Sequence, residues 1–203
     1  PPGDIQKVWD ATEGRFAHLE FGFSCMGYEL PAAIGVRFAD PDPKHRITTF
    51  IGEGTFLMAP TELVTAAQEG LPLTIVVSEN HGYQVIRRLQ MWRVGNNFGN
   101  EFRYRKDSDN IVESVLEKSG SPRLEGKYLD VDIVSIARGL GAHSLRVRTV
   151  EEFRNGRGLN EVYLKDGKPE GIPVEMADAV IRIFDWCEAN GATLLAGDPD
   201  ARE

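Results

Sequence analysis

Two short apolar runs, residues 47–51 and 73–77, flank a segment in which apolar residues recur at helical spacing. The second run is continuous and rich in β-branched residues, which is typical of a strand buried on both faces of a sheet. The segment between the runs predicts a helix that has Thr61 as its N-cap and ends at Gly70. The order strand, helix, strand predicts a parallel β-α-β unit and an α/β fold.

Apolar spacing predicts further helices on both sides of this unit. An Asp-Pro-Asp-Pro sequence ends the helix that precedes it, because residues before proline are pushed out of the helical region. Asp130 or Asp132 is well placed near the start of a later helix, and Gly141 follows its end. The predicted helices cover residues 30–39, a segment from Val85, residues 132–140, a segment from residue 149 and residues 174–187; residues 143–147 predict another strand.

Each strand of the β-α-β unit is followed by a turn with a polar side chain. Glu53 lies between Gly52 and Gly54 after the first strand, and Asn80 follows the second. Both turns should emerge at the carboxyl edge of the sheet, where open α/β sheets bind ligands. Oxygen-bearing side chains beside bare backbone suit a hard cation that holds a phosphate group. The alternative is a tight turn with a solvated acid, and the spacing alone leaves both interpretations open.

The glycine turn does not match the commoner phosphate motifs. It lacks the third glycine of a dinucleotide fingerprint, and no glycine-rich loop ends in Gly-Lys-Ser/Thr. Neither a Rossmann cofactor nor a P-loop nucleotide is therefore supported.

Composition narrows the classes of function. The net charge is −8, from 23 Lys and Arg against 31 Asp and Glu, which opposes a general nucleic-acid surface. Without an 18-residue apolar run or a charged-then-apolar leader, we expect neither membrane insertion nor a signal peptide. Cys25 and Cys187 lack metal-type spacing and fit a reducing cytoplasm. The chain starts at Pro1 and not at Met, so we expect a processed chain, a fragment or one part of a larger protein.

Two motifs in this order resemble a known cofactor-binding domain. The first is the Gly-Glu-Gly turn followed by Asn80, and the second is Met-Gly-Tyr-Glu-Leu-Pro-Ala-Ala-Ile-Gly at residues 26–35. Together they resemble the C-terminal, diphosphate-binding domain of thiamine-diphosphate-dependent enzymes of the acetolactate synthase and pyruvate decarboxylase type. The resemblance covers about residues 18–153. It implies a three-layer α/β/α fold with a mostly parallel sheet, and thiamine diphosphate and Mg²⁺ as cofactors.

Within that family, shorter segments resemble the trihydroxycyclohexane-dione hydrolases of inositol breakdown. The segment 89–103 discriminates best, because it lies outside the shared cofactor motifs; residues 21–29, 62–65 and 129–132 agree with it. This resemblance implies hydrolytic C–C cleavage of a cyclic 1,2-dione. The alternatives are a 2-oxo-acid decarboxylase or acetolactate-synthase-like carboligase subunit, and a non-catalytic domain that keeps the fold for assembly.

The resemblance also implies a role for each motif residue. Glu53, Asn80 and the carbonyl of Gly82 would hold Mg²⁺. Gly54 and Thr55 would offer backbone N–H groups to the diphosphate, Thr55 also its hydroxyl, and Gly52 belongs to the same turn. The Ser24 carbonyl and the Met26 N–H would meet the aminopyrimidine ring, and the Met26 side chain would be the wedge under the cofactor. Tyr83 would pack near the metal loop. Each has a simpler interpretation: Met26 as core filler, Thr55 as a helix cap. His81 is expected to be a solvated loop residue.

Two departures from the family pattern matter. The family has Asp at the position of Glu53, and the extra methylene moves the carboxylate outward by roughly 1.5 Å. In the family, the glutamate that activates the aminopyrimidine belongs to a separate pyrimidine-binding domain, usually on a neighbouring chain; we expect no such domain in this sequence, so the catalytic residue is unknown. We expect a cofactor-binding domain over residues 1–154, a C-terminal extension over 155–203, a small carbonyl substrate and a homo- or hetero-oligomer that includes a pyrimidine-binding partner.

Overall fold

The structure is a computed structural model that describes residues 5, 6, 9, 16–42, 44–95, 97–104 and 126–148. The predicted extension over residues 155–203 and the predicted helix over 174–187 lie outside these residues. In chain order the elements are α2 (Glu29–Ala39), β1 (Thr48–Gly52), α3 (Glu53–Phe56), α4 (Glu62–Gln68), β2 (Thr74–Ser78), α5 (Gln84–Val94) and α7 (Ile133–Gly139).

The two strands pair in parallel, as the β-α-β pattern predicts. The register runs from Thr48 opposite Thr74 to Gly52 opposite Ser78, so both strands end at the same edge of the sheet. β1 alternates between buried and half-buried positions, whereas all five residues of β2 are half-buried. The prediction that β2 is buried on both faces is therefore wrong for the part of the chain that the structure describes. The predicted position of this strand in the sequence is right. The α/β class is confirmed.

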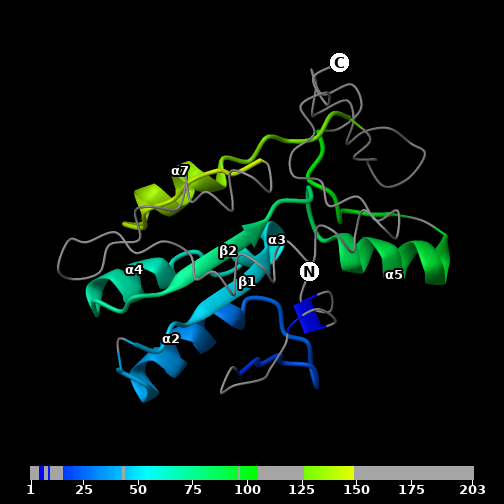
Figure 1. Cartoon of the computed structure of the whole chain (residues 1–203). Helices are drawn as coiled ribbons and strands as arrows, with labels where there is room; N and C mark the ends of the chain where they lie inside the picture. The colour runs from blue at the N-terminus through cyan, green and yellow to red at the C-terminus, as the bar shows by residue number, and fades with distance from the viewer. Residues whose placement is uncertain are drawn as a thin grey trace.

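The helices pack around these strands on one apolar core. In Figure 1, α2 lies below β1 and β2, and α7 lies above them. Two side chains at the centre, Ile51 of β1 and Phe56 of α3, are each 1% exposed. The helices α2, α3, α4 and α7 each add at least one buried side chain to this cluster, whereas α5 adds none; the other buried members are Leu30, Leu63, Ile133 and Ala137. The core thus fixes α3, the short helix that directly follows β1.

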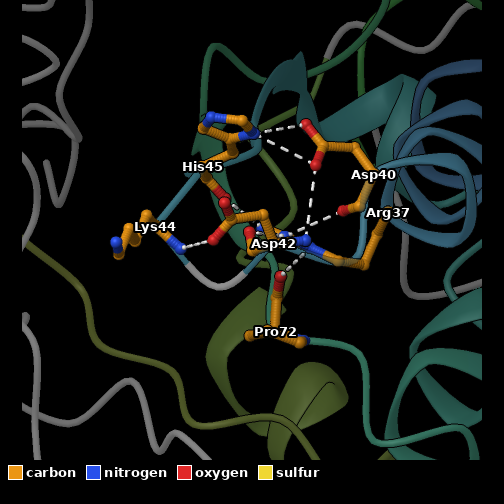
Figure 2. A network of polar contacts seen from close by, with 6 residues as sticks. All are labelled: Arg37, Asp40, Asp42, Lys44, His45 and Pro72. Carbon is orange, nitrogen blue, oxygen red and sulfur yellow. Dashed lines mark hydrogen bonds and ion pairs between the residues drawn. The ribbon is translucent and has the colours of Figure 1, made fainter.

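A buried arginine holds the end of α2. Arg37 is 4% exposed, and its guanidinium donates to four backbone carbonyls, those of Pro72, Asp40, Asp42 and His45, at 2.6–3.2 Å (Figure 2). Planar guanidinium with several fixed donors suits such a cluster of carbonyls. The contact with Pro72 also ties α2 to the segment that leads into β2.

Helix ends agree with the predictions in one place and differ in another. Asp132 caps α7, because its carboxylate accepts the N–H of Ser135 at 3.0 Å and the Ser135 hydroxyl at 2.6 Å. Thr61 stands at the N-cap position of α4, but its side chain makes no capping hydrogen bond, since its backbone is already helical.

The predicted strand over residues 143–147 is wrong. This stretch carries no strand in the part of the chain that the structure describes. The α7 helix holds it through side chains: Arg138 donates to the carbonyl of Ser144 at 2.9 and 3.2 Å, and the Ser144 hydroxyl donates to the carbonyl of Val134 at 2.8 Å. Arg146 turns toward Glu79, with 3.1 Å between the charged atoms. Contacts of this kind, and not a strand ladder, fix the stretch beside β2.

No helix among the described residues has the length and apolar character that crossing a membrane requires.

Candidate functional site

The turns after β1 and β2 meet at the carboxyl edge of the sheet. Gly52 is opposite Ser78 in the register, so Glu53 and Asn80 follow strand ends that lie side by side. Glu53 starts α3, and Asn80 lies in the turn that leads to α5. The predicted juxtaposition of these two residues is therefore present in the structure.

The Glu53 carboxylate bridges the two turns directly. Its Oε1 atom accepts the backbone N–H of Asn80 at 3.0 Å and that of Gly82 at 2.6 Å. The residue is only 3% exposed. Burial raises the pKa of the Glu53 carboxyl, and the N–H groups of Gly82 and Asn80 offset that effect only in part. The acid is thus held by one oxygen inside the protein, which excludes the interpretation of a solvated acid in a tight turn.

Two buried oxygens at this site have no hydrogen-bond partner. They are Oε2 of Glu53 and Oδ1 of Asn80. Buried acceptors without partners cost free energy, so each such atom needs an explanation. Oxygens of a carboxylate and an amide are ligands that a hard divalent cation takes, and the residues present therefore fit Mg²⁺. Among the described residues, no group of three or more His, Cys, Asp or Glu side chains could hold a metal ion, so further ligands would have to be carbonyl, water or phosphate oxygens.

Glycine is required at position 54 by a close approach of an aromatic ring. A Cβ on Gly54 would lie 2.7 Å from both Cδ1 and Cε1 of Tyr83. Tyr83 also packs edge-on against Phe102, with 5.6 Å between the ring centroids. Gly54 and Thr55 belong to the first turn of α3, where backbone N–H groups lack partners within a helix. The ring thus packs directly on the predicted diphosphate turn.

The turn that contains Gly82 is clamped from the other side by residues 100–102. Tyr83 donates its N–H to the carbonyl of Asn100 at 2.7 Å, and Phe102 donates its N–H to the carbonyl of His81 at 3.0 Å. Gly82 is buried with φ at +132°, and a Cβ there would overlap the carbonyl oxygen of Asn100. The segment 98–103, which resembles the dione hydrolases, therefore supports the predicted metal turn.

Glu101 is the centre of this clamp. The residue is 9% exposed, and its carboxylate lies 3.2 Å from Nε of Arg87 and 3.4 Å from Nε of Arg103. It also accepts the Tyr128 hydroxyl at 3.1 Å and the Asn97 amide at 2.9 Å. Burial works against ionisation, but the arginines and these hydrogen bonds outweigh it and lower the pKa of the Glu101 carboxyl. The acid is thus a structural anion.

His81 does not behave as the predicted solvated loop residue. Its backbone φ is +63°, a left-handed conformation that residues other than glycine rarely adopt. Its ring is half-buried and stacks on Tyr128, with 4.2 Å between the centroids and 16° between the planes. This stacking and the bond from Phe102 account for the unusual backbone of the turn.

The predicted ring-binding residues lie on a different loop. Ser24 is exposed with φ at +52°, and Met26 is 41% exposed, so Met26 is not core filler. The loop contacts the segment after α3, because a Cβ on Gly27 would lie 3.4 Å from Cβ of Met58. The structure thus brings together Glu53, Asn80, Gly82, Gly54 and Tyr83, with Gly52 and Thr55 beside them in sequence; it places Ser24 and Met26 on the neighbouring loop.

Sequence reasoning missed Glu20, Asn100 and Glu101 as supports of these turns. Glu20 accepts backbone N–H groups of the loop that carries Ser24, whereas the other two hold the Gly82 turn. The only signal in the sequence was the resemblance of segments 21–29 and 98–103 to one subfamily. Glu20 bonds to N–H groups three and five residues ahead, and residues 100 and 101 meet the Gly82 turn through their backbone; neither kind of contact leaves a periodic pattern of apolar residues.

Comparisons with known proteins show which family the chain resembles. The family described as "Thiamine pyrophosphate enzyme, C-terminal TPP binding domain" matches residues 3–162. A 3D-(3,5/4)-trihydroxycyclohexane-1,2-dione hydrolase of Geobacillus thermodenitrificans is 36% identical over 171 residues, 84% of this chain and 24% of the relative. The same-named protein of Clostridium tetani is 35% identical over 153 residues, 75% of this chain and 22% of the relative.

A solved structure is also similar. It is a thiamine diphosphate-dependent 4-hydroxybenzoylformate decarboxylase of Rhodococcus jostii RHA1, 26% identical, with a TM-score of 0.47 over 64% of this chain and 20% of that one. The chain spans about a quarter of the length of the curated relatives it matches. With a family match over most of its length, the chain belongs to the thiamine pyrophosphate enzymes and corresponds to their C-terminal TPP-binding domain.

Proposed function

We propose that this domain anchors thiamine diphosphate through Mg²⁺ at the carboxyl edge of β1 and β2. One observation carries the proposal: Oε2 of Glu53 and Oδ1 of Asn80 are both buried, both lack a hydrogen-bond partner, and both are oxygens of the type that Mg²⁺ prefers. Family membership supplies the cofactor, and these two atoms supply the reason for a divalent cation between protein and diphosphate.

The other residues divide between the two ends of the cofactor. The carbonyl of Gly82 would be a third metal ligand, and the first-turn N–H groups of Gly54 and Thr55 would meet the diphosphate. Ser24 and Met26, on the exposed loop beside α3, would meet the aminopyrimidine ring and hold the cofactor bent. When bound, thiamine diphosphate supplies an ylid that adds to a carbonyl and accepts electrons from the bond that breaks. This domain contributes binding and orientation.

For the enzyme to which the domain belongs, we propose hydrolytic ring opening of a cyclic 1,2-dione. The support is sequence identity above 30% to relatives that are named as hydrolases of such a dione. Because the chain spans only about a quarter of those relatives, the activating glutamate would come from a pyrimidine-binding domain or subunit within an oligomer. A cytoplasmic location is part of the same proposal.

Calorimetric titration tests the anchor. We expect thiamine diphosphate to bind the wild-type chain only when Mg²⁺ is present, and Glu53→Gln to weaken that binding by roughly tenfold or more, because a metal ligand loses its charge. Glu69→Gln, a matched change at an exposed carboxylate at the end of α4, should leave the affinity unchanged.

Equal affinity of Glu53→Gln and the wild type would contradict the proposed metal site. Binding in EDTA as strong as with Mg²⁺ would do the same. Product analysis after adding a pyrimidine-domain partner, with the cyclic dione and with pyruvate, then separates the hydrolase from a decarboxylase or carboligase.

A further inference from the structure

The loop that precedes α2 is held by a single carboxylate. Glu20 uses both of its oxygens: Oε1 accepts the N–H of Phe23 at 2.8 Å, and Oε2 accepts the N–H of Cys25 at 2.8 Å. Hydrogen bonds from N–H groups to an ionised acid are stronger than those between neutral groups. These two bonds hold the pKa of the Glu20 carboxyl below its usual value. The side chain therefore stays ionised at neutral pH and closes the turn between residues 20 and 25.

The residue between the two donors has an unfavourable backbone conformation. Ser24 has φ at +52°, in the left-handed region that residues other than glycine rarely adopt. The flanking N–H groups of Phe23 and Cys25 are the ones that Glu20 holds. Without that carboxylate, nothing else that the structure describes in this turn fixes Ser24 in this conformation. Glu20 thus determines which way the backbone groups around Ser24 point.

The side chains of this turn lie on the protein surface and not in the core. The side chains around it are open to solvent: Phe21 is 79% exposed and Phe23 91%. A Cβ on Gly27 would lie 3.4 Å from Cβ of Met58 and 3.9 Å from Cβ of Ala59, in the segment after α3. The loop that carries this turn therefore reaches the segment after α3, the helix that contains the diphosphate turn, and its Met26 is 41% exposed.

We propose that Glu20 is a positioning residue for the heterocyclic end of the cofactor: by binding the N–H of Cys25, which shares a peptide group with the Ser24 carbonyl, it holds that carbonyl in the orientation that an aminopyrimidine ring requires. The inference rests on the proposed function, since it concerns the same cofactor. It also assigns different ends of the cofactor to different residues. The Glu53 and Asn80 turns hold the diphosphate, whereas Glu20 acts only on recognition of the ring.

The test compares two ligands in the presence of Mg²⁺, thiamine diphosphate and inorganic pyrophosphate. Glu20→Gln keeps the size of the side chain but turns one acceptor oxygen into an amide donor that faces an N–H group. We expect this variant to bind thiamine diphosphate roughly tenfold more weakly or worse, and to bind pyrophosphate as the wild type does. Glu69→Gln is the matched control and should change neither affinity.

The pyrophosphate measurement separates positioning from folding. An equal loss for both ligands would mean that Glu20 supports the whole domain, and no loss for either would mean that the turn does not depend on it; both outcomes overturn the inference. Wild-type binding of pyrophosphate without any gain from the rings of thiamine diphosphate would also overturn it and leave the diphosphate anchor intact. Wild-type binding of neither ligand would refute the proposed function itself.

Discussion

Shortening Glu53 to aspartate should destabilise the metal-free domain, even though aspartate is the residue that the family resemblance implies at this position. The Glu53→Asp change removes one methylene and draws the carboxylate back by roughly 1.5 Å. The bonds from Oε1 to the N–H groups of Asn80 and Gly82 are now 3.0 and 2.6 Å long. Both would stretch to about 4 Å or more if the turn stayed in place, which is beyond hydrogen-bonding distance.

The expected loss of stability can be worked out from the two backbone N–H groups that Glu53→Asp leaves without an acceptor. Each N–H group that loses its acceptor inside the protein costs roughly 1–3 kcal/mol. Two such groups, with partial relaxation of the turn, give an expected loss of about 2–3 kcal/mol in the free energy of unfolding. For a domain whose total stability is about 5–15 kcal/mol, this is a large and measurable fraction.

Urea unfolding in EDTA, followed by circular dichroism, measures this loss. Glu69→Asp makes the same chemical change at an exposed carboxylate and should shift the free energy of unfolding by less than about 0.5 kcal/mol. Adding Mg²⁺ should recover part of the loss in Glu53→Asp, because a shorter acid can still ligate a cation. A Glu53→Asp variant as stable as the wild type in EDTA would refute the reasoning, since the two amide bonds would then contribute nothing.

Three further changes test the supports of the fold and the site. In urea unfolding, Gly82→Ala should lower the free energy of unfolding by at least about 2 kcal/mol more than Gly70→Ala, because only the change at position 82 adds a Cβ that overlaps the Asn100 carbonyl. Equal losses would contradict the clamp by residues 100–102. Arg37→Met should lower stability by about 3 kcal/mol or more, as four carbonyls lose a buried donor, whereas Arg88→Met on the exposed face of α5 should change thermal unfolding little. Bonds from Ser135 lower the folded-state pKa of the Asp132 carboxyl, so the stabilisation by this cap is present above the ordinary pKa of 3.8 and is lost as the pH falls through the lowered pKa. The difference in unfolding free energy between the wild type and Asp132→Ala should therefore be constant from neutral pH down to about 3.8 and shrink at lower pH. A difference that does not change with pH would argue against an ionised cap.

The sequence predicted most of the described elements because their causes are local. The apolar run before Glu53 and the β-branched run before Glu79 became β1 and β2, with ends within one residue of the prediction. Asp132 caps α7 as its position suggested, because capping depends on residues three apart. The predicted strand over residues 143–147 failed for the opposite reason. Its conformation depends on specific side-chain contacts, with Arg138 six residues before Ser144 and with Glu79 far away in the chain, which a pattern of apolar residues does not encode.

The sequence predicted the candidate metal ligands of the site, but it did not predict the residues that hold those ligands in place. Spacing within one β-α-β unit placed Glu53 and Asn80 at one edge, since parallel strands end together. The clamp by residues 100–102 and the stacking of His81 on Tyr128 join segments that no repeat relates. His81 was therefore expected in solvent, and its ring is instead half-buried against Tyr128.

The extra methylene of Glu53 has a physical consequence beyond the outward shift of its carboxylate. A longer side chain can divide its two oxygens between two tasks, and in this structure Oε1 already bonds to the backbone of the second turn while Oε2 is left unpaired beside it. One oxygen thus fixes the spacing of the two turns before any cation arrives, and the other is left for the cation. A preorganised turn reduces the ordering that binding must otherwise impose, which offsets part of what a longer ligand arm loses in geometry. Stability in EDTA and affinity for Mg²⁺ should therefore respond separately to changes at Glu53, the first through Oε1 and the second through Oε2.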